Sequence, residues 1–225
     1  MKSLKNVKLP LLLLIFCLAF TALKSQDKES EKLQAAANVL NNFVAMKEKI
    51  PQKLLQVTQG IIVIPKLINA GFVVGGKRGK GIAVIKHEDG TWSDPVFITL
   101  TGGSIGFQVG VQSIDLVLIF KSRETLEKIG KGSFTLGGDA SITAGPVGRN
   151  SSASTDYKLE AEVYSYSRSK GLFAGISLSG SALDVDSKSN TAFYGEETDA
   201  ANIFSDSTKE APHSAENLKI TLQNL

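Results

Sequence analysis

Residues 102–106 (GGSIG) have the residue types and spacing of a serine nucleophile motif. The G-x-S-x-G pattern places its serine on a turn between a strand and a helix, and the acid and histidine partners follow later in the chain. Here strand-like residues continue after the motif, and the later histidine, His213, lies in a polar segment. We therefore interpret Ser104 as part of a glycine-rich turn. An esterase that acts through Ser104 is kept as a minor hypothesis.

Residues 75–81 (GGKRGKG) resemble a phosphate-binding loop but lack two of its essential features. A P-loop has four residues between its first glycine and the Gly-Lys pair, and a Ser or Thr after the lysine ligates magnesium. This segment is one residue too short, and Gly81 follows Lys80. A nucleotide-hydrolysing P-loop is excluded, whereas an anion site made of backbone N–H groups and flanking cations stays open.

Asp184 and Asp186 begin a pattern like that of a calcium-binding loop. Lys188 stands at the third ligand position, Ser189 at the glycine position and Gly195 at the closing glutamate position. We therefore expect the solvated tip of a hairpin here. The chain has two histidines and one cysteine, too few for a His/Cys metal site. We predict no metal and no other cofactor.

The N-terminal residues have the composition of an export signal. Three lysines accompany an apolar stretch at residues 9–22. At about 14 residues it is shorter than the ~20 that a membrane-spanning helix needs. We predict a signal peptide at residues 1–25, with an uncleaved anchor as the alternative, and hence an exported protein, periplasmic or extracellular. Cys17 would then leave with the signal.

The charge is unevenly distributed along the 225 residues. The sequence has 25 basic and 22 acidic side chains, a net charge of +3, and four of the lysines belong to residues 1–25. Without that segment the net charge is −1, composed of +6 over residues 26–86 and −7 over residues 87–225. This distribution excludes a generally basic nucleic-acid-binding protein and concentrates the cations in the N-terminal third.

The pattern of apolar residues predicts helices first, then strands punctuated by glycine, then short helices. We expect helical segments at residues 33–50, 51–55, 122–130, 200–204 and 214–222. We expect strands at residues 61–64, 70–74, 81–85, 96–100, 105–111, 114–120, 134–144, 159–166 and 172–178. Residues 75–80 should be a turn that joins two of these strands into a hairpin. The fold class is α+β, with N-terminal helices packed on a glycine-rich, mainly antiparallel β-sheet or barrel and short C-terminal helices.

Several long motifs, in the right order, resemble the SYLF domain family. They begin with AGFVVGGKRGKG at residues 70–81 and continue with WSDP and TGGSIGFQVG. The matching segments are residues 70–81, 92–97, 101–117, 134–149, 164–175 and 193–195. The resemblance covers about residues 31–205, and the chain is similar to exported bacterial members of the family.

The resemblance implies a non-enzymatic, lipid-binding protein of the cell envelope. Some eukaryotic members of the family bind phosphoinositides (phosphatidylinositol lipids), and fungal members also bind and bundle actin. We place the lipid-binding domain at residues 26–205, followed by a polar tail with a weak helix at residues 206–225. An exported bacterial protein does not meet actin inside its own cell, so actin binding is not extended to this chain.

The glycine turn and its neighbours suggest a site for anionic phospholipid headgroups at a membrane surface. Each cation near such a surface contributes on the order of 1 kcal/mol, so five contribute about 5 kcal/mol. A dissociation constant of 1 mM already corresponds to about 4 kcal/mol, so charge alone gives weak, salt-sensitive binding. Insertion of Leu54 and Leu55, or several copies of the protein, would strengthen it. The five cations of this hypothesis are Lys66, Lys77, Arg78, Lys80 and Lys86.

Two other interpretations remain open at this point. The lysines can simply keep a hairpin tip solvated, because runs of surface charge are common. The protein can also be a structural or protein-interaction module of the envelope that contacts another protein and binds no specific lipid.

Overall fold

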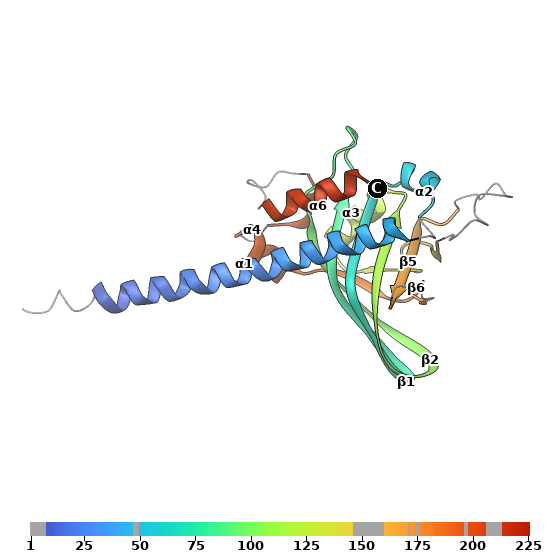
Figure 1. The fold of residues 1–225 in the computed structure, drawn as a ribbon, viewed down its shortest axis with the longest axis horizontal. Helices are drawn as coiled ribbons and strands as arrows, with labels where there is room; N and C mark the ends of the chain where they lie inside the picture. The colour runs from blue at the N-terminus through green and yellow to red at the C-terminus, as the bar shows by residue number, and fades with distance from the viewer. Residues whose placement is uncertain are drawn as a thin grey trace, which may run out of the picture.

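A ribbon of two long antiparallel strands organises the fold (Figure 1). β1 (Gly60–Ile85) and β2 (Val96–Phe120) pair along almost their whole length, and residues 86–95 connect them. The computed structural model describes residues 8–46, 50–145, 160–170, 172–173, 176–195, 198–205 and 213–225.

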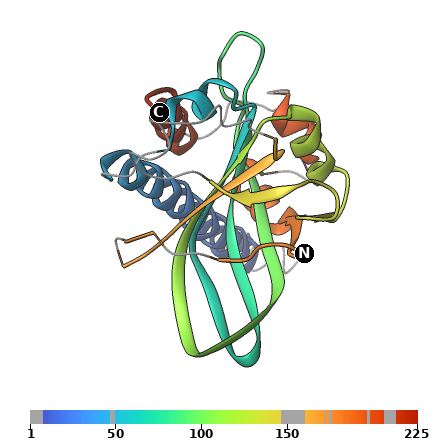
Figure 2. The same ribbon diagram turned by 90° about the vertical axis from the view of Figure 1, so that its right-hand side faces the viewer.

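The ribbon bends back on itself near its middle, so that the two halves of β1 lie side by side (Figures 1 and 2). The halves are so close that they leave no room for a side chain at two positions. A Cβ at Gly75 would lie 2.2 Å from the carbonyl oxygen of Ala70, and a Cβ at Gly81 would lie 2.1 Å from that of Val63. Glycine is therefore required at both positions, and the bend depends on it.

This arrangement contradicts our prediction of a turn at residues 75–80. Each of these residues pairs with β2, from the Gly75–Ser104 pair to the Lys80–Thr99 pair. The predicted strands at 96–100, 105–111 and 114–120 likewise merge into β2. Gly75 and Gly79 resemble a turn signal, but they are glycine because Ala70 and Leu67, from the other half of the same strand, pack against them.

Five short strands extend the ribbon, and together the strands form one seven-stranded sheet within the described part of the chain. β7 pairs antiparallel with the N-terminal half of β2, and β5 pairs antiparallel with its C-terminal half. One parallel pair joins β4 to β5. The sheet curls into a half-barrel (Figure 2), which confirms the α+β class with a mainly antiparallel sheet. These strands are β3 (Phe134–Thr135), β4 (Ile142–Ala144), β5 (Val163–Ser169), β6 (Leu172–Phe173) and β7 (Ala182–Val185).

Helices cover both faces of the sheet. α3 begins after the predicted N-cap, because the Ser122 side chain accepts a hydrogen bond from the Thr125 N–H. α1 includes residues assigned above to the signal peptide, and its N-terminal part extends away from the sheet (Figure 1). Within the described residues, no helix is both long and apolar enough to cross a membrane. The helices are α1 (Lys8–Ala45), α2 (Gln52–Gln56), α3 (Arg123–Gly130), α4 (Ser187–Tyr194), α5 (Ala200–Phe204) and α6 (His213–Gln223).

The core has two parts, one on each face of the sheet. On the face that we call the α1 face, α1 and α6 pack over Val63, Val84 and Val117. On the opposite α3 face, α3 and α5 pack over Ile64 and Ile85. The weak helix expected in a polar tail is α6, and it contributes buried residues to the α1 face, namely Ala215, Leu218 and Leu222.

The close packing at Gly81 predicts a large effect of a single methyl group. Gly81→Ala should lower the free energy of unfolding by about 3 kcal/mol or more, because the new Cβ meets a backbone carbonyl that cannot move alone. Gly103→Ala is the matched control, since an added Cβ there has no atom within 4 Å, and its effect should stay within about 1 kcal/mol. Urea unfolding followed by Trp92 fluorescence measures both. Equal midpoints for the two variants would contradict the packing argument.

Candidate functional site

The five cations predicted to bind headgroups do not form one cluster. Successive side chains of a strand point to opposite faces of the sheet. Lys77 consequently lies on the α3 face, whereas Arg78 and Lys80 lie on the α1 face. Lys66 lies in an irregularity of β1, and Lys86 follows the end of that strand. Each cation therefore has its own surroundings.

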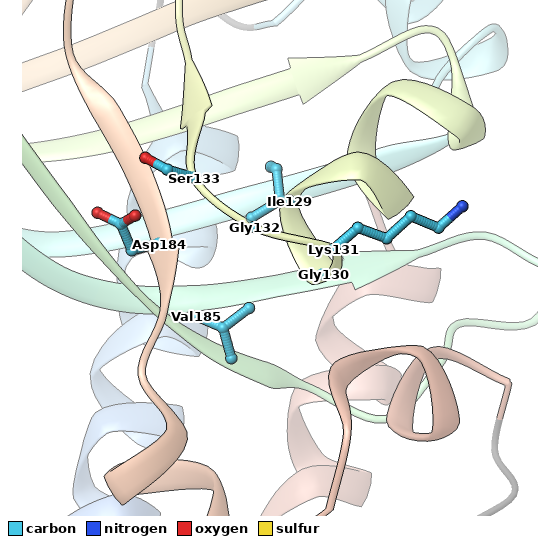
Figure 3. A pocket seen from close by; sticks show the side chains of 7 residues that line it. All are labelled: Ile129, Gly130, Lys131, Gly132, Ser133, Asp184 and Val185. Atoms are coloured by element: carbon cyan, nitrogen blue, oxygen red, sulfur yellow. The ribbon is translucent and has the colours of Figure 1, made fainter.

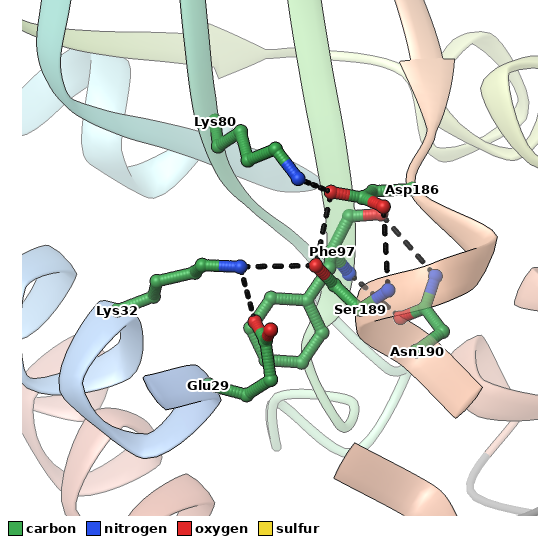
Figure 4. A network of polar contacts seen from close by, with 7 residues as sticks. All are labelled: Glu29, Lys32, Lys80, Phe97, Asp186, Ser189 and Asn190. Carbon is green, nitrogen blue, oxygen red and sulfur yellow. Dashed lines mark hydrogen bonds and ion pairs between the residues drawn. The ribbon is translucent and has the colours of Figure 1, made fainter. Parts of the chain in front are cut away.

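Lys80 belongs to a polar cluster that joins three elements (Figure 4). Its Nζ is 2.6 Å from Oδ2 of Asp186, which is the N-cap of α4 and accepts a hydrogen bond from the Ser189 N–H. From α1, Lys32 donates to Ser189 Oγ at 2.9 Å and pairs with Glu29. The cluster holds α1 and α4 to β1, so Lys80 has a structural partner.

The segment around Asp186 is the start of a helix, so our prediction of a solvated hairpin tip is wrong. The following turn packs against β2, where Asn190 Oδ1 accepts a hydrogen bond from the Phe97 N–H at 2.9 Å. Burial by itself raises the pKa of Asp186, but the hydrogen bonds from Lys80 and Ser189 outweigh it and hold the pKa below its usual value. Within the described residues, no group of three or more His, Cys, Asp or Glu side chains is placed to hold a metal ion.

Lys77 is buried on the α3 face with only 5% of its surface exposed. Its Nζ donates a hydrogen bond to the backbone carbonyl of Ser177, and burial lowers its pKa. No carboxylate among the described residues pairs with it. Lys77 therefore links the ribbon to the segment before β7 through the Ser177 carbonyl, and it does not face a membrane.

Lys86 and Leu54 also lie away from a common lipid site. The Lys86 ammonium is 5.8 Å from the centre of the Trp92 ring, at the connection between β1 and β2. Leu54 is fully buried in the core of the α1 face, and Leu55 packs against the same cluster. Insertion of these two leucines into a membrane, as we had expected, would require the core to open.

Of the five cations, Lys66 and Arg78 are exposed and lie on neighbouring parts of the two halves of β1. An added Cβ at Gly79 would lie 3.2 Å from Cα of Leu67, which shows that the residues next to these cations are neighbours across the two halves of β1. Within the described residues, neither side chain has an ion-pair or hydrogen-bond partner. Asp115, which accepts a hydrogen bond from the Lys66 N–H, is itself paired with Arg168 at 2.8 Å.

Apart from the buried Lys77, the ribbon carries no charge between these two cations and its bend. Residues 67–76 of β1 and 101–114 of β2, which we call the ribbon end, contain no Asp, Glu, Lys or Arg. Val74 and Val111 are 71% and 73% exposed there, and Ile68 is partly exposed. The ribbon end projects beyond the body of the molecule (Figures 1 and 2). Sequence reasoning missed this surface because its alternating apolar residues resemble an ordinary half-buried strand, and its lack of charge was the available signal.

A surface hollow of about 380 Å³ lies between the C-terminal end of α3 and β7 (Figure 3). Asp184 and Ser133 line it from one side, while the side chain of Lys131 points away from Asp184. The rest of its lining consists of Ile129, Gly130, Gly132 and Val185. Within the described residues, no hydrogen bond joins the Ser133 hydroxyl to the Asp184 carboxylate, and we assign no chemistry to the hollow.

Ser104 is not on a strand–helix turn. It lies inside β2, where it pairs with Gly75, and the strand continues on both sides. The glycine-rich turn that we expected there is therefore also part of the ribbon. The backbone context that makes a serine nucleophilic in the G-x-S-x-G motif is not present at this position.

Comparison with known proteins identifies the family. The family described as Ysc84, Las17-binding protein actin regulator, matches residues 101–225. The chain belongs to this family. This confirms the resemblance to SYLF domain proteins on which the motif analysis rested, and the match continues through α6.

Three relatives show how much of a longer protein the family domain represents. LAS seventeen-binding protein 3 of Saccharomyces cerevisiae is 35% identical over 194 residues, which cover 85% of this chain and 42% of that protein. Protein YSC84 of the same yeast is 36% identical over 85% of this chain and 41% of its own length. The human SH3 domain-containing YSC84-like protein 1 is 34% identical over 87% of this chain and 57% of its own length. The chain thus spans about half the length of these relatives.

The polar cluster predicts a loss of stability in acid. Because the pKa of folded Asp186 is depressed, its contribution to stability is complete above the unfolded pKa of about 3.9 and is lost as the pH falls through the folded value. The unfolding free energies of the wild type and Asp186→Ala should differ by about 1–3 kcal/mol at pH 7 and converge below about pH 4. Glu31→Gln, an exposed substitution on α1, controls for the loss of one negative charge. A difference that stays constant to pH 2.5 would exclude the Asp186 carboxylate as the cause.

The burial of Lys77 predicts that its contribution to the stability of the fold increases as the pH rises in the alkaline range. Its folded pKa lies below the ordinary 10.5, so holding the ammonium in the fold opposes stability at neutral pH, and this cost disappears as the pH rises towards 10.5. The stability of the wild type relative to Lys77→Met should therefore increase between pH 7 and pH 10. Thermal or urea unfolding across that range measures it, with the exposed Lys53→Met as background. A flat or falling difference would show that burial does not disfavour the charged lysine.

Proposed function

We propose that the chain is a non-enzymatic domain that binds the surface of anionic lipid membranes. The observation that carries this proposal is the pairing of Lys66 and Arg78, which lie exposed and without partners among the described residues, at the border of an uncharged, projecting ribbon end. Family membership supports it, because the SYLF resemblance implies lipid binding. Two cations at one level of the ribbon replace the five in a glycine turn that we first expected.

Two cations give a weak attraction on their own. At about 1 kcal/mol each they contribute about 2 kcal/mol, half of what corresponds to a dissociation constant of 1 mM. The attraction should fall as salt screens the charges, with a screening length of about 10 Å at 0.1 M. The proposed binding therefore needs a second, apolar contribution or several copies of the protein at one membrane.

We also propose that residues 1–25 direct export, so that the membrane in question belongs to the cell envelope. The apolar stretch of this segment would bind vesicles by itself, so the binding experiment should use both the full chain and the chain from residue 26. Within the described side chains, the buried residues of α1 begin at Glu29, so the shorter chain keeps the core contacts of the helix. An N-terminus near residue 26 in protein recovered from the envelope would support export, and an intact Met1 would contradict it.

Vesicle co-sedimentation tests the lipid proposal. Both chains should bind vesicles rich in an anionic phospholipid better than neutral phosphatidylcholine vesicles, and 0.5 M salt should weaken the preference. Replacing both Lys66 and Arg78 by Ala should weaken binding to anionic vesicles about 30-fold, the factor that ~2 kcal/mol represents. The control Lys53→Ala with Lys131→Ala removes the same charge from exposed positions elsewhere. Equal, salt-independent recovery with both lipids would reject the proposal.

A second candidate function is the binding of a protein partner. The name of the matching family, Las17-binding protein actin regulator, and the name of the yeast relative LAS seventeen-binding protein 3 favour it. For this chain the partner would be a protein of its own compartment, and the domain would serve as a structural or interaction module. Recovery of a specific partner together with no vesicle binding in the assay above would favour this function over lipid binding.

A further inference from the structure

We propose that the ribbon end inserts into one leaflet of a lipid bilayer while Lys66 and Arg78 remain at the headgroups. This inference rests on the proposed function and specifies how the membrane is bound. The occupant of the exposed apolar surface is therefore a lipid monolayer with anionic headgroups, and the inserted residues include Val74 and Val111.

The exposed valines continue a face that is covered elsewhere in the molecule. Along β1, Val74 shares its side of the strand with Ile82 and Val84, which lie in the core under α1. Along β2, Val111 shares its side with Val117, which lies in the same core. The α1 face thus continues past the helices, first through the charged residues Arg78, Lys80 and Asp115 and then to the two valines, which are more than 70% exposed at the ribbon end.

The charge pattern selects lipid as the occupant. The ribbon end has no charged residue, so no ionised side chain must leave water when it enters the membrane, and its polar side chains, such as Gln112 and Ser113, are uncharged. The cations at its border complement anionic headgroups. Uncharged residues lie at the end and the exposed cations Lys66 and Arg78 lie behind them, where the one carboxylate at the same level, Asp115, is already paired with Arg168. This order suits a monolayer boundary.

The dimensions fit one leaflet. From Arg78 to the bend near Gly71 and Val73 the strand runs for about five residues, roughly 15–20 Å at 3.3 Å per residue. One half of a hydrocarbon core of about 30 Å is of similar depth. The curvature of the ribbon makes the actual reach shorter.

Backbone hydrogen bonding limits the depth further. Within the ribbon end β1 and β2 pair with each other, for instance at Val74–Ile105, so the groups between the two strands are satisfied without water. Among the described residues, β5 and β7 pair with β2 only outside the stretch 102–114, which leaves the outer edge of β2 unpaired there. Unpaired backbone groups are not tolerated in the bilayer centre. The ribbon end therefore lies at the boundary between headgroups and acyl chains, the depth of about 5–10 Å that interfacial segments reach.

A fluorescent label reports the insertion directly. The chain from residue 26 contains no cysteine, so Val74→Cys provides a single attachment point for an environment-sensitive dye. On binding anionic vesicles the dye at position 74 should shift to shorter wavelength and be quenched by phospholipid brominated near the headgroup end of its acyl chains. The same dye at Val57→Cys, an exposed valine beside α2, should do neither.

Substitution gives the second test. Val74→Asp with Val111→Asp should weaken binding to anionic vesicles at least tenfold and remove the part of the binding that persists in 0.5 M salt. The control Val57→Asp with Ile220→Asp, at exposed apolar positions elsewhere, should bind as the wild type does. Unchanged unfolding midpoints confirm that the variants fold.

The results of these experiments distinguish the insertion of the ribbon end from the binding of anionic membranes on which it rests. Wild-type chain that ignores all vesicles overturns both. Insertion alone is overturned by three results together. The wild-type chain binds anionic vesicles, the dye at position 74 neither shifts nor is quenched, and Val74→Asp with Val111→Asp binds as the wild type does. Loss of binding in that double variant, together with quenching at position 74, supports insertion.

Discussion

The close approach of the two halves of β1 is the constraint on which the rest of the structure depends. The Val63 carbonyl lies where a side chain at Gly81 would begin, so the ribbon can double back only with glycine at that position. Doubling back turns one pair of strands into the centre of a curled sheet with two apolar faces. Each face then needs helices to cover it, which α1 and α6 supply on one side and α3 and α5 on the other.

Predictions from local sequence patterns succeeded for local structure and failed where contacts between distant residues decide the structure. The α+β class, the helix that Ser122 caps and the C-terminal helices follow from local periodicity and capping, and the structure contains them. The turn at residues 75–80 was wrong because glycine is read locally as a chain reversal, whereas here it accommodates a distant part of the same strand. Asp186 was misread for a related reason. Its partner Lys80 is 106 residues away, and no local rule connects them.

Neighbours in the sequence of a strand are not neighbours on its surface. Lys77 and Arg78 are adjacent in the chain, yet one is buried against the Ser177 carbonyl and the other is exposed on the opposite face. Lys66, which is distant in sequence, lies beside Arg78 because the ribbon doubles back. A basic segment that looked like one headgroup site is therefore divided, and the exposed pair of cations is created by the bend.

Three of the six segments that resemble the family, residues 70–81, 92–97 and 101–117, lie in the ribbon or in its connection. Gly75 and Gly81 allow the close approach within β1, Gly102 faces Ser181, and Ser104 lies within paired strand. These motifs therefore reflect the backbone geometry of the ribbon in this chain and do not by themselves specify a binding partner. The side chains that the ribbon exposes near its bend are set separately from these glycines. In this chain they include Val74 and Val111, with the exposed Arg78 and Lys66 just behind them, and the membrane proposal rests on that arrangement.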